Sequence, residues 1–396
     1  MNRNHSTGSR VREARKRRGL TQRELSRLSG VSLSLITKLE QGEYGHTRLE
    51  TLHRLAAILG VPTSALTTER DAPVPSRESA AVWEPVRRVL EGIPEAEPAE
   101  EPTLEGVKSA FRGMLPLLVA SRFAEMGAVL PALLRDADAL VACSADDALP
   151  AARTLRAQVR QVAGSLMTHT WQFETADRAF TMAMDDASDP LTAMSVTEER
   201  CWGLIRQGRL SETRELAFRW ADENEPRMSG SRNELAAWGR LLIRASNAAV
   251  RDNRPGEARD ALRMARMAAA GTDRDFILPH SPWHIFGPVT VSVAAAENAT
   301  IQDKPETTLA IAAHIDGAKM PVPRYAPSHR LDVANAHVAL RQYPEAVGIL
   351  QRMRRERPQW LPQQRYASDI LAKIIKHRRT LTPEMRDLAD FVHLAL

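Results

Sequence analysis

The chain has 396 residues, 43% hydrophobic and 26% charged, which is enough for two or three domains around a large core. Its two cysteines, Cys143 and Cys201, lack the spacing of a disulfide framework or a metal motif, as expected in a reducing cytosol. The N-terminus has no apolar segment typical of a secretory signal, and the prolines and histidines in 276–296 exclude a membrane span there. We therefore expect a cytoplasmic chain with no membrane segment.

The positive charge of the chain is concentrated at one end. Residues 1–70 carry 13 lysines and arginines against 6 aspartates and glutamates, whereas the remaining residues carry 41 against 43. The net charge of +5 therefore comes from the N-terminal segment, as attraction to nucleic-acid phosphates would require. A solvated basic face is the alternative explanation of such a segment.

Five short helical segments are predicted within residues 1–67. Residues 1–9 are polar, so we expect order from about residue 10, where a basic helix over 10–18 begins. Two helices over 22–41 follow, with Thr21 and Glu24 at the spacing of a capping box and Gly30 suited to the turn between them. A helix over 49–59 and a short turn over 63–66 complete the segment.

The stretch LTQRELSRLSGVSLSLITKLEQG, residues 20–42, resembles the helix-turn-helix of the phage-repressor and Cro-like (XRE) family. It has the Thr-Gln opening, the turn glycine, the Ile-x-x-Leu-Glu close and the glycine after it. The resemblance covers about residues 10–66 and implies a five-helix lambda-repressor-like domain that binds a double-stranded DNA operator. It also implies an ion pair between Arg15 and Glu40 that holds the first helix on the third. An ordinary helical hairpin is the alternative.

The same resemblance implies which side chains contact DNA. Those expected to face bases in the major groove are Ser32, Leu33, Ser34, Thr37 and Lys38. Those expected to contact phosphates are Gln22, Arg23, Gln41 and Arg48. The base-facing positions lack Gln, Asn and Arg, so bidentate base contacts are scarce and DNA shape should contribute to recognition. For each residue, plain surface exposure is the alternative.

Residues 68–103 are rich in proline and glutamate, which predicts a linker. A short amphipathic helix over 81–90 is predicted inside it, with Trp83, Val86 and Leu90 on one face. The sequence leaves open whether the N-terminal head is docked or only tethered.

From residue 104 to residue 396 the sequence predicts helices only, recurring in pairs. Small residues recur near the start of the second helix, 37, 45, 50 and 38 positions apart, at Ala176, Thr213, Ala258, Thr308 and Ala346. The pattern resembles tetratricopeptide (TPR) repeats, best matched at 327–358, and implies an all-α TPR-like solenoid. Within it, 276–296 is expected to be a buried loop that leads into a core helix.

The first helices of the pairs should line a concave surface. Asn247 and Asn335 take equivalent inward positions there, where an asparagine can bond both N–H and C=O of an extended peptide. The peptide-sensing regulators of the RNPP group, which the architecture resembles, use this logic. His169 and Arg206 lie at comparable places. Ordinary helix-surface side chains are the alternative.

No motif in the sequence predicts catalysis. It has no Gly-rich phosphate loop, no His-Glu-x-x-His and no nucleophile elbow. His280 and His284 are four apart, but Pro282 between them excludes a metal pair on one helical face. We therefore expect no enzyme activity, no cofactor and no metal.

These observations together predict a bacterial transcriptional regulator that is cytoplasmic, and nucleoid-associated when bound to DNA. Its repeat domain is expected to form a homodimer and to sense a small molecule or a peptide. The alternative is a DNA-tethered TPR scaffold that recruits a protein partner.

Overall fold

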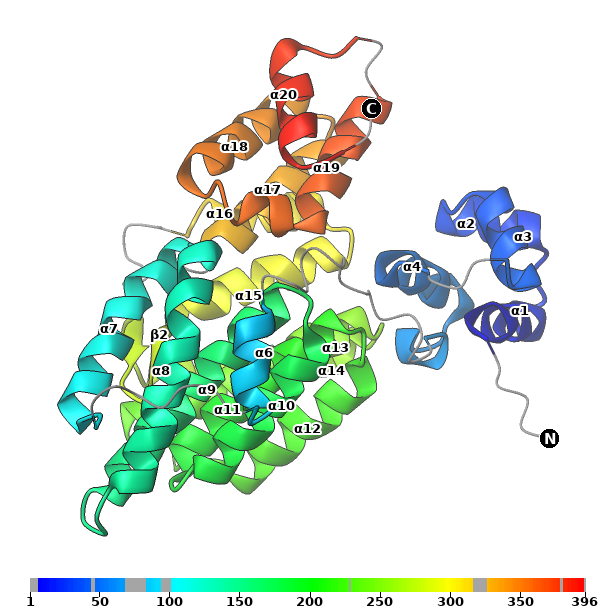
Figure 1. Cartoon of the computed structure of the whole chain (residues 1–396). Coiled ribbons are helices and arrows are strands. Elements are labelled where there is room, and N and C mark those ends of the chain that lie inside the picture. The colour runs from blue at the N-terminus through cyan, green and yellow to red at the C-terminus, as the bar shows by residue number, and fades with distance from the viewer. Residues whose placement is uncertain are drawn as a thin grey trace.

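The computed structural model describes residues 6–43, 47–67, 83–93, 101–227, 229–315, 326–377 and 380–394. A small helical head lies beside a longer arc of paired helices (Figure 1). Within the described residues every regular element is helical except one two-stranded hairpin. The chain therefore has the predicted all-α fold, a five-helix head followed by TPR-like repeats. Among the described helices, none combines the length and the apolar composition that a membrane crossing requires.

The head consists of α1 (Thr7–Arg17), α2 (Gln22–Ser29), α3 (Leu33–Gln41), α4 (Leu49–Leu59) and η1 (Thr63–Ala65). The capping box at the start of α2 is confirmed, since the hydroxyl of Thr21 accepts from the Glu24 amide and the Glu24 carboxylate accepts from the Thr21 amide. Gly30 adopts φ of +66°, which lets the chain turn into α3. The two motif helices thus start and stop where their local sequence predicts.

The first helix begins at Thr7, earlier than the expected start at residue 10, and the expectation of disorder up to residue 9 is wrong for residues 6–9. Ser6 caps the helix by accepting from the amide of Ser9. Gly8 is buried against the end of α3, where a Cβ would lie 1.8 Å from the carbonyl oxygen of Leu39. This close approach orders the first turn of α1.

A further helix, α6 (Glu84–Leu90), precedes the repeats. It begins at Glu84, and residues 81–82 of the expected helix lie outside the described residues. The expected apolar face of Trp83, Val86 and Leu90 is at most 5% exposed and belongs to the repeat core. Trp83 lies close to Gly127, so α6 packs on the repeats.

The repeats are formed by seven consecutive helix pairs within the described residues. They are α7 (Leu104–Ala120) with α8 (Phe123–Cys143), α9 (Leu149–His169) with α10 (Phe173–Asp186), α11 (Pro190–Arg206) with α12 (Leu210–Glu223), α13 (Arg232–Arg251) with α14 (Pro255–Ala270), α15 (Pro288–Ile301) with α16 (Pro305–Ala312), α17 (Ala326–Ala339) with α18 (Tyr343–Glu356), and α19 (Arg365–Lys376) with α20 (Pro383–Phe391). The first helices of successive pairs contact one another, so they form the inner layer of the arc.

A shared turn explains the repeating small residues. In five pairs, one residue of the turn has a positive φ, and a small residue follows it five positions later. The turn residues are Trp171, Gly208, Asn253, Asp303 and Arg341. The five small residues are at most 3% exposed, because they lie where the second helix approaches the first most closely.

The expectation of helices only after residue 104 is wrong, since the start of the expected buried loop over 276–296 forms two strands, although the segment is largely buried and leads into a helix as expected. Strands β1 (Phe276–Leu278) and β2 (Ser281–Phe286) form an antiparallel hairpin, and α15 follows directly. The hairpin lies on the inner layer of the arc. The ring of Trp283 packs edge-on against Phe111 of α7, and the carbonyl of Ile285 accepts from Arg240 of α13. Part of the predicted concave surface is therefore covered.

Candidate DNA-binding and ligand-binding sites

One face of α3 is buried in the head and the other is open. Ile36 and Leu39 are at most 1% exposed and pack in the head core. The predicted base-facing residues that are exposed are Ser32, Leu33, Ser34 and Lys38. Two hydroxyls, one apolar side chain and one cation on one helix can contact base edges and the thymine methyl group.

The remaining predicted base contact, Thr37, is half-buried and bonded to the predicted phosphate contact Gln22. The Thr37 hydroxyl donates to Oε1 of Gln22 at 3.2 Å, and Nε2 of Gln22 donates to Oε2 of Glu40 at 2.9 Å. These bonds fix α2 against α3. In this arrangement the side chains of Thr37 and Gln22 stabilise the packing of the two motif helices.

The predicted ion pair of Arg15 and Glu40 is confirmed. Nε and Nη2 of Arg15 donate to the two carboxylate oxygens of Glu40 at 2.7 and 2.8 Å, and Nη1 donates to the Leu20 carbonyl. Burial by itself would raise the pKa of Glu40, but the hydrogen bonds from Arg15 and Gln22 hold that pKa below its ordinary value. The pair therefore joins α1 to α3 beneath the exposed face.

The other predicted phosphate contacts differ in their surroundings. Arg23 and Gln41 are exposed at the two ends of the motif. Arg48, the residue before α4, instead donates to Asp369 of α19 at 2.5 Å. In the docked arrangement the Arg48 guanidinium therefore contacts the repeats.

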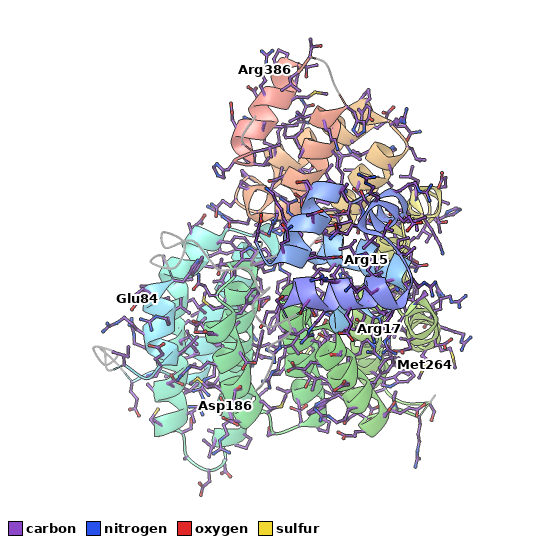
Figure 2. All side chains as sticks on the ribbon, turned by 90° about the vertical axis from the view of Figure 1, so that its right-hand side faces the viewer. Arg15, Arg17, Glu84, Asp186, Met264 and Arg386 are labelled. Carbon is purple, nitrogen blue, oxygen red and sulfur yellow. The ribbon has the colours of Figure 1, made fainter. Side chains whose placement is uncertain are left out.

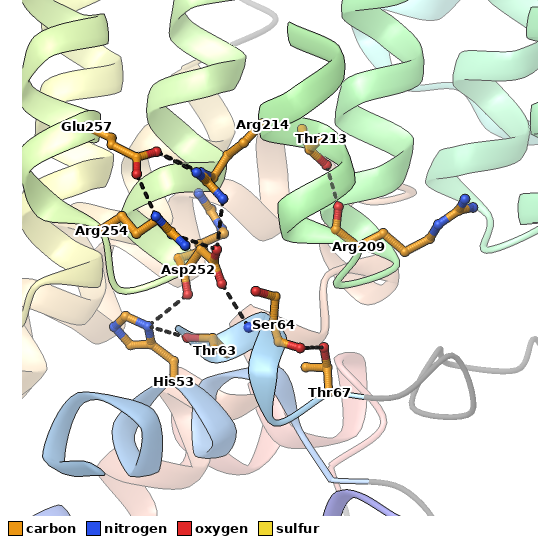
Figure 3. Close-up of polar contacts among 11 residues, drawn as sticks. His53, Thr63, Ser64, Thr67, Arg209, Thr213, Arg214, Asp252, Arg254 and Glu257 are labelled. Carbon is orange, nitrogen blue, oxygen red and sulfur yellow. Dashed lines mark hydrogen bonds and ion pairs between the residues drawn. The ribbon is translucent and has the colours of Figure 1, made fainter. Parts of the chain in front are cut away.

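The head docks on the repeats through α4 and the segment after it, with α4 on the side toward the repeats and α2 and α3 farther away (Figure 1). Nδ1 of His53 donates to the carbonyl of Arg251 at 2.9 Å, and the amide of Ser64 donates to Asp252 at 2.8 Å (Figure 3). Asn253 donates to the carbonyl of Val61 at 3.3 Å. These contacts leave the exposed face of α3 uncovered.

Asp252 is fully buried and holds the centre of this contact. Arg214 and Arg254 lie 3.3 and 3.4 Å from its Oδ2, while Oδ1 accepts from Ser64 (Figure 3). A buried carboxylate needs such compensation. On α19, Lys373 donates to Glu50 of α4 at 3.3 Å.

The predicted ligand-binding residues fall into three places. His169 and Arg206 meet around Trp202, whose ring centroid is 4.6 Å from the imidazole and 5.8 Å from the guanidinium carbon. Asn247 donates to Glu297 of α15 at 3.1 Å. Asn335 accepts from Lys373 at 3.1 Å. The two asparagines therefore bond to charged side chains of the protein itself.

Three side chains that the sequence did not indicate belong to this surface. Trp171 covers Arg206, with the guanidinium carbon 4.2 Å from its ring centroid. Arg251 donates to the carbonyl of Asn247 at 3.0 Å and to Glu297 at 2.5 Å. The signal that was available for Trp171 was its place five residues before Ala176, in the recurring turn. Arg251 and Glu297 carried no comparable signal.

A buried cluster beneath the hairpin has the donor atoms of a metal site, since those of Glu198, Glu199 and His284 lie within 4.8 Å of one another. Glu198, however, pairs with Arg240 at 2.7 Å and Arg244 at 2.6 Å. Nε2 of His284 lies 2.5 Å from Glu199. Two guanidinium groups compensate the Glu198 carboxylate, and His284 and Trp283 of the hairpin contact Glu199, so these contacts join the hairpin to α11.

The geometry of α2 and α3, with a capped first helix, a glycine turn and an exposed second helix, defines the head as a helix-turn-helix DNA-binding domain joined to TPR-like repeats. Residues 11–66 match the family model described as Helix-turn-helix.

The chain is 42% identical over 55 residues to the uncharacterized HTH-type transcriptional regulator RghRB of Bacillus subtilis (strain 168). That match covers 14% of this chain and 40% of RghRB, so the chain spans about two fifths of the length of this curated relative.

Two solved structures are also similar. Bacillus thuringiensis PlcR in complex with the peptide PapR7 and DNA gives a TM-score of 0.30 at 13% identity, covering 68% of this chain and 96% of PlcR. The apo form of ComR from S. thermophilus gives 0.29 at 11% identity, covering 94% of this chain and 99% of ComR.

Proposed function

We propose that this chain is a cytoplasmic, sequence-specific transcriptional regulator whose head reads an operator and whose repeats form a homodimer and sense a small molecule or a peptide. The observation that carries the proposal is the exposed face of α3 on a head that holds 13 basic against 6 acidic side chains within residues 1–70. A basic surface attracts phosphates, and the helix then contacts base edges. In this proposal residues 1–67 bind DNA, residues 68–103 connect the two domains, and residues 104–396 form the dimer and bind the signal.

Dimerisation is proposed because one head offers few strong base contacts. Two heads on adjacent half-sites would multiply the discrimination between sequences. The repeats and the connection together carry 41 basic and 43 acidic side chains, so electrostatic repulsion between two copies is slight. Light scattering on the full chain at micromolar concentration tests this, and a monomer would contradict it.

The arrangement of the head supports a specific role for the signal. Because α4 and the segment after it contact the repeats while α3 stays open, a ligand in the repeats would act by changing the position of the head, without touching DNA. No catalytic step and no cofactor is needed for this role, and we propose none.

The alternative, a scaffold that brings a protein partner to DNA, makes a different prediction for the purified chain. Mass spectrometry of the chain isolated under native conditions would find a stoichiometric protein for the scaffold and a small molecule or peptide for the sensor. Genome-wide capture of bound DNA fragments would give the operator in either case.

Substitutions in α3 should change which sequences are bound. Lys38→Ala and Ser34→Ala are expected to relax discrimination by roughly 1–3 kcal/mol at single base pairs, because both side chains are exposed on the face that enters the groove. Arg23→Ala should weaken binding to all sequences alike, since it is placed for phosphate. Selection from a randomised operator library measures this. An altered sequence preference for Arg23→Ala with none for Lys38→Ala would place the reading face elsewhere.

A further inference from the structure

The environment of Arg206 differs from that of other arginines in the repeats. It is the last residue of α11, and its guanidinium carbon lies 4.2 Å from the ring centroid of Trp171 and 5.8 Å from that of Trp202. Burial, together with the charge of Arg251, lowers the pKa of Arg206 to about 10. The cation is thus held between two aromatic faces in a partly desolvated place.

One edge of this guanidinium is unused. Nε and Nη2 of Arg206 are buried and have no hydrogen-bond partner within the described part of the chain. These are the two donors that lie side by side and match the two oxygens of a carboxylate. Leaving them without an acceptor costs free energy, because a buried donor loses its water without gaining a bond.

The same edge is occupied elsewhere in this protein. Nε and Nη2 of Arg15 bind Glu40 at 2.7 and 2.8 Å, those of Arg156 bind Asp186 at 2.8 and 2.6 Å, and those of Arg209 bind Glu212 at 2.8 and 2.6 Å. In each case one carboxylate takes both donors. Arg206 presents this arrangement without the carboxylate.

The backbone conformation of Trp171 contributes to the place of its ring. Trp171 adopts φ of +66°, a left-handed conformation that is unfavourable for a bulky side chain. Equivalent turns place Gly208, Asn253 and Asp303 there, which are residue types that tolerate it, and Arg341, which like Trp171 has a bulky side chain. In this conformation Trp171 holds its ring over Arg206.

We propose that Nε and Nη2 of Arg206 bind a carboxylate group of the ligand that the repeats sense, between the rings of Trp171 and Trp202. This inference rests on the proposed sensing function and adds the chemical class of the signal. The ligand would lie beside the head, because Gly208, two residues after Arg206, is close to Leu49 at the start of α4.

Acetate, with acetamide as its neutral counterpart, tests the proposal on the full chain. Acetate at millimolar concentration is expected to change tryptophan fluorescence in a saturable way and to raise the melting temperature, whereas acetamide should do neither. Arg206→Met should abolish the response. Arg206→Lys, which keeps the charge and loses the two-donor edge, should weaken it by about tenfold. Arg209→Met is the matched control, since Arg209 is exposed and already paired, and should respond as the unaltered chain does.

Circular dichroism establishes that each variant is folded, and Arg206→Lys keeps the test valid if the methionine variant is not. An absent acetate response, an equal response to acetamide, or a response that survives in Arg206→Met would overturn the proposal, as would tighter binding of inorganic phosphate at the same ionic strength. Operator binding is measured on the same samples. Its loss from the unaltered chain would count against the proposed function, whereas a failed acetate test with intact operator binding counts against the carboxylate site alone.

Discussion

Replacing Arg15 with methionine is expected to lower the free energy of unfolding of the head by about 3–5 kcal/mol, because the buried Glu40 would keep its charge without a cationic partner. The side chains of the pair are 11% and 3% exposed, so water replaces little of the lost bond. A domain of this size has a total stability of roughly 3–9 kcal/mol, so much of the head should open. Hydrogen exchange of the α1–α3 amides measures the loss, and DNA affinity should fall with it.

Two variants and a pH series control this experiment. Arg17→Met, on the same helix as Arg15 (Figure 2), should change stability by no more than about 0.5 kcal/mol. The ion pair of Arg17 with Glu13 is 3.8 Å long and exposed. The double variant Arg15→Met/Glu40→Leu should recover much of the loss, since it leaves no buried charge.

The pH dependence follows from the lowered pKa of Glu40. A carboxyl group whose pKa is lower in the folded state stabilises the fold above its ordinary pKa, and the contribution is lost as the pH falls through the lowered value. In Arg15→Met the buried Glu40 becomes neutral at acidic pH. The difference between the two proteins should therefore shrink as the pH falls, and a constant difference would argue against the pair as its cause.

Operator affinity should fall steeply with salt, by about 10³-fold between 50 and 200 mM if six phosphates are contacted by the bound protein. The motivation is the excess of basic side chains confined to residues 1–70. Binding isotherms at several salt concentrations give the slope of log affinity against log salt. Arg23→Ala should reduce that slope by about 1.

The same salt series on a matched control variant distinguishes the contribution of the head to the salt dependence from that of the repeats. Arg352→Ala on α18 lies outside the head and should leave the slope unchanged. A slope near zero for the unaltered chain would mean that contacts between cationic side chains and phosphates contribute little, and the placement of Arg23 against DNA would be wrong.

The head could be predicted in detail because its constraints are local. Thr21 with Glu24 starts α2, and Gly30 ends it, through bonds and dihedral angles within a few residues. The start of α1 could not be predicted, because Gly8 is ordered by its close approach to Leu39, thirty-one positions away along the chain. The composition of residues 1–9 is polar and gives no indication of that contact.

The repeats show the same limit. The small residues predicted the helix pairs, because each lies at a fixed distance from its turn. The hairpin was missed because its strands are short and depend on Phe111 and Arg240, which are distant in sequence. The ring of Trp171 over Arg206 was missed, because the recurring turn marks the position of Trp171 in the sequence but does not indicate what its ring contacts.

Docking of the head has a consequence for the length of the operator. The contacts of His53, Ser64 and Arg48 hold α3 at a fixed place on the repeats. In a dimer with both heads docked, the separation of the two recognition helices is therefore a constant of the protein. One added base pair between half-sites moves the second by about 3.4 Å and turns it by about 34°. The docked dimer would therefore bind only operators with one spacing between half-sites. Release of the heads would widen the range of half-site spacings that it binds.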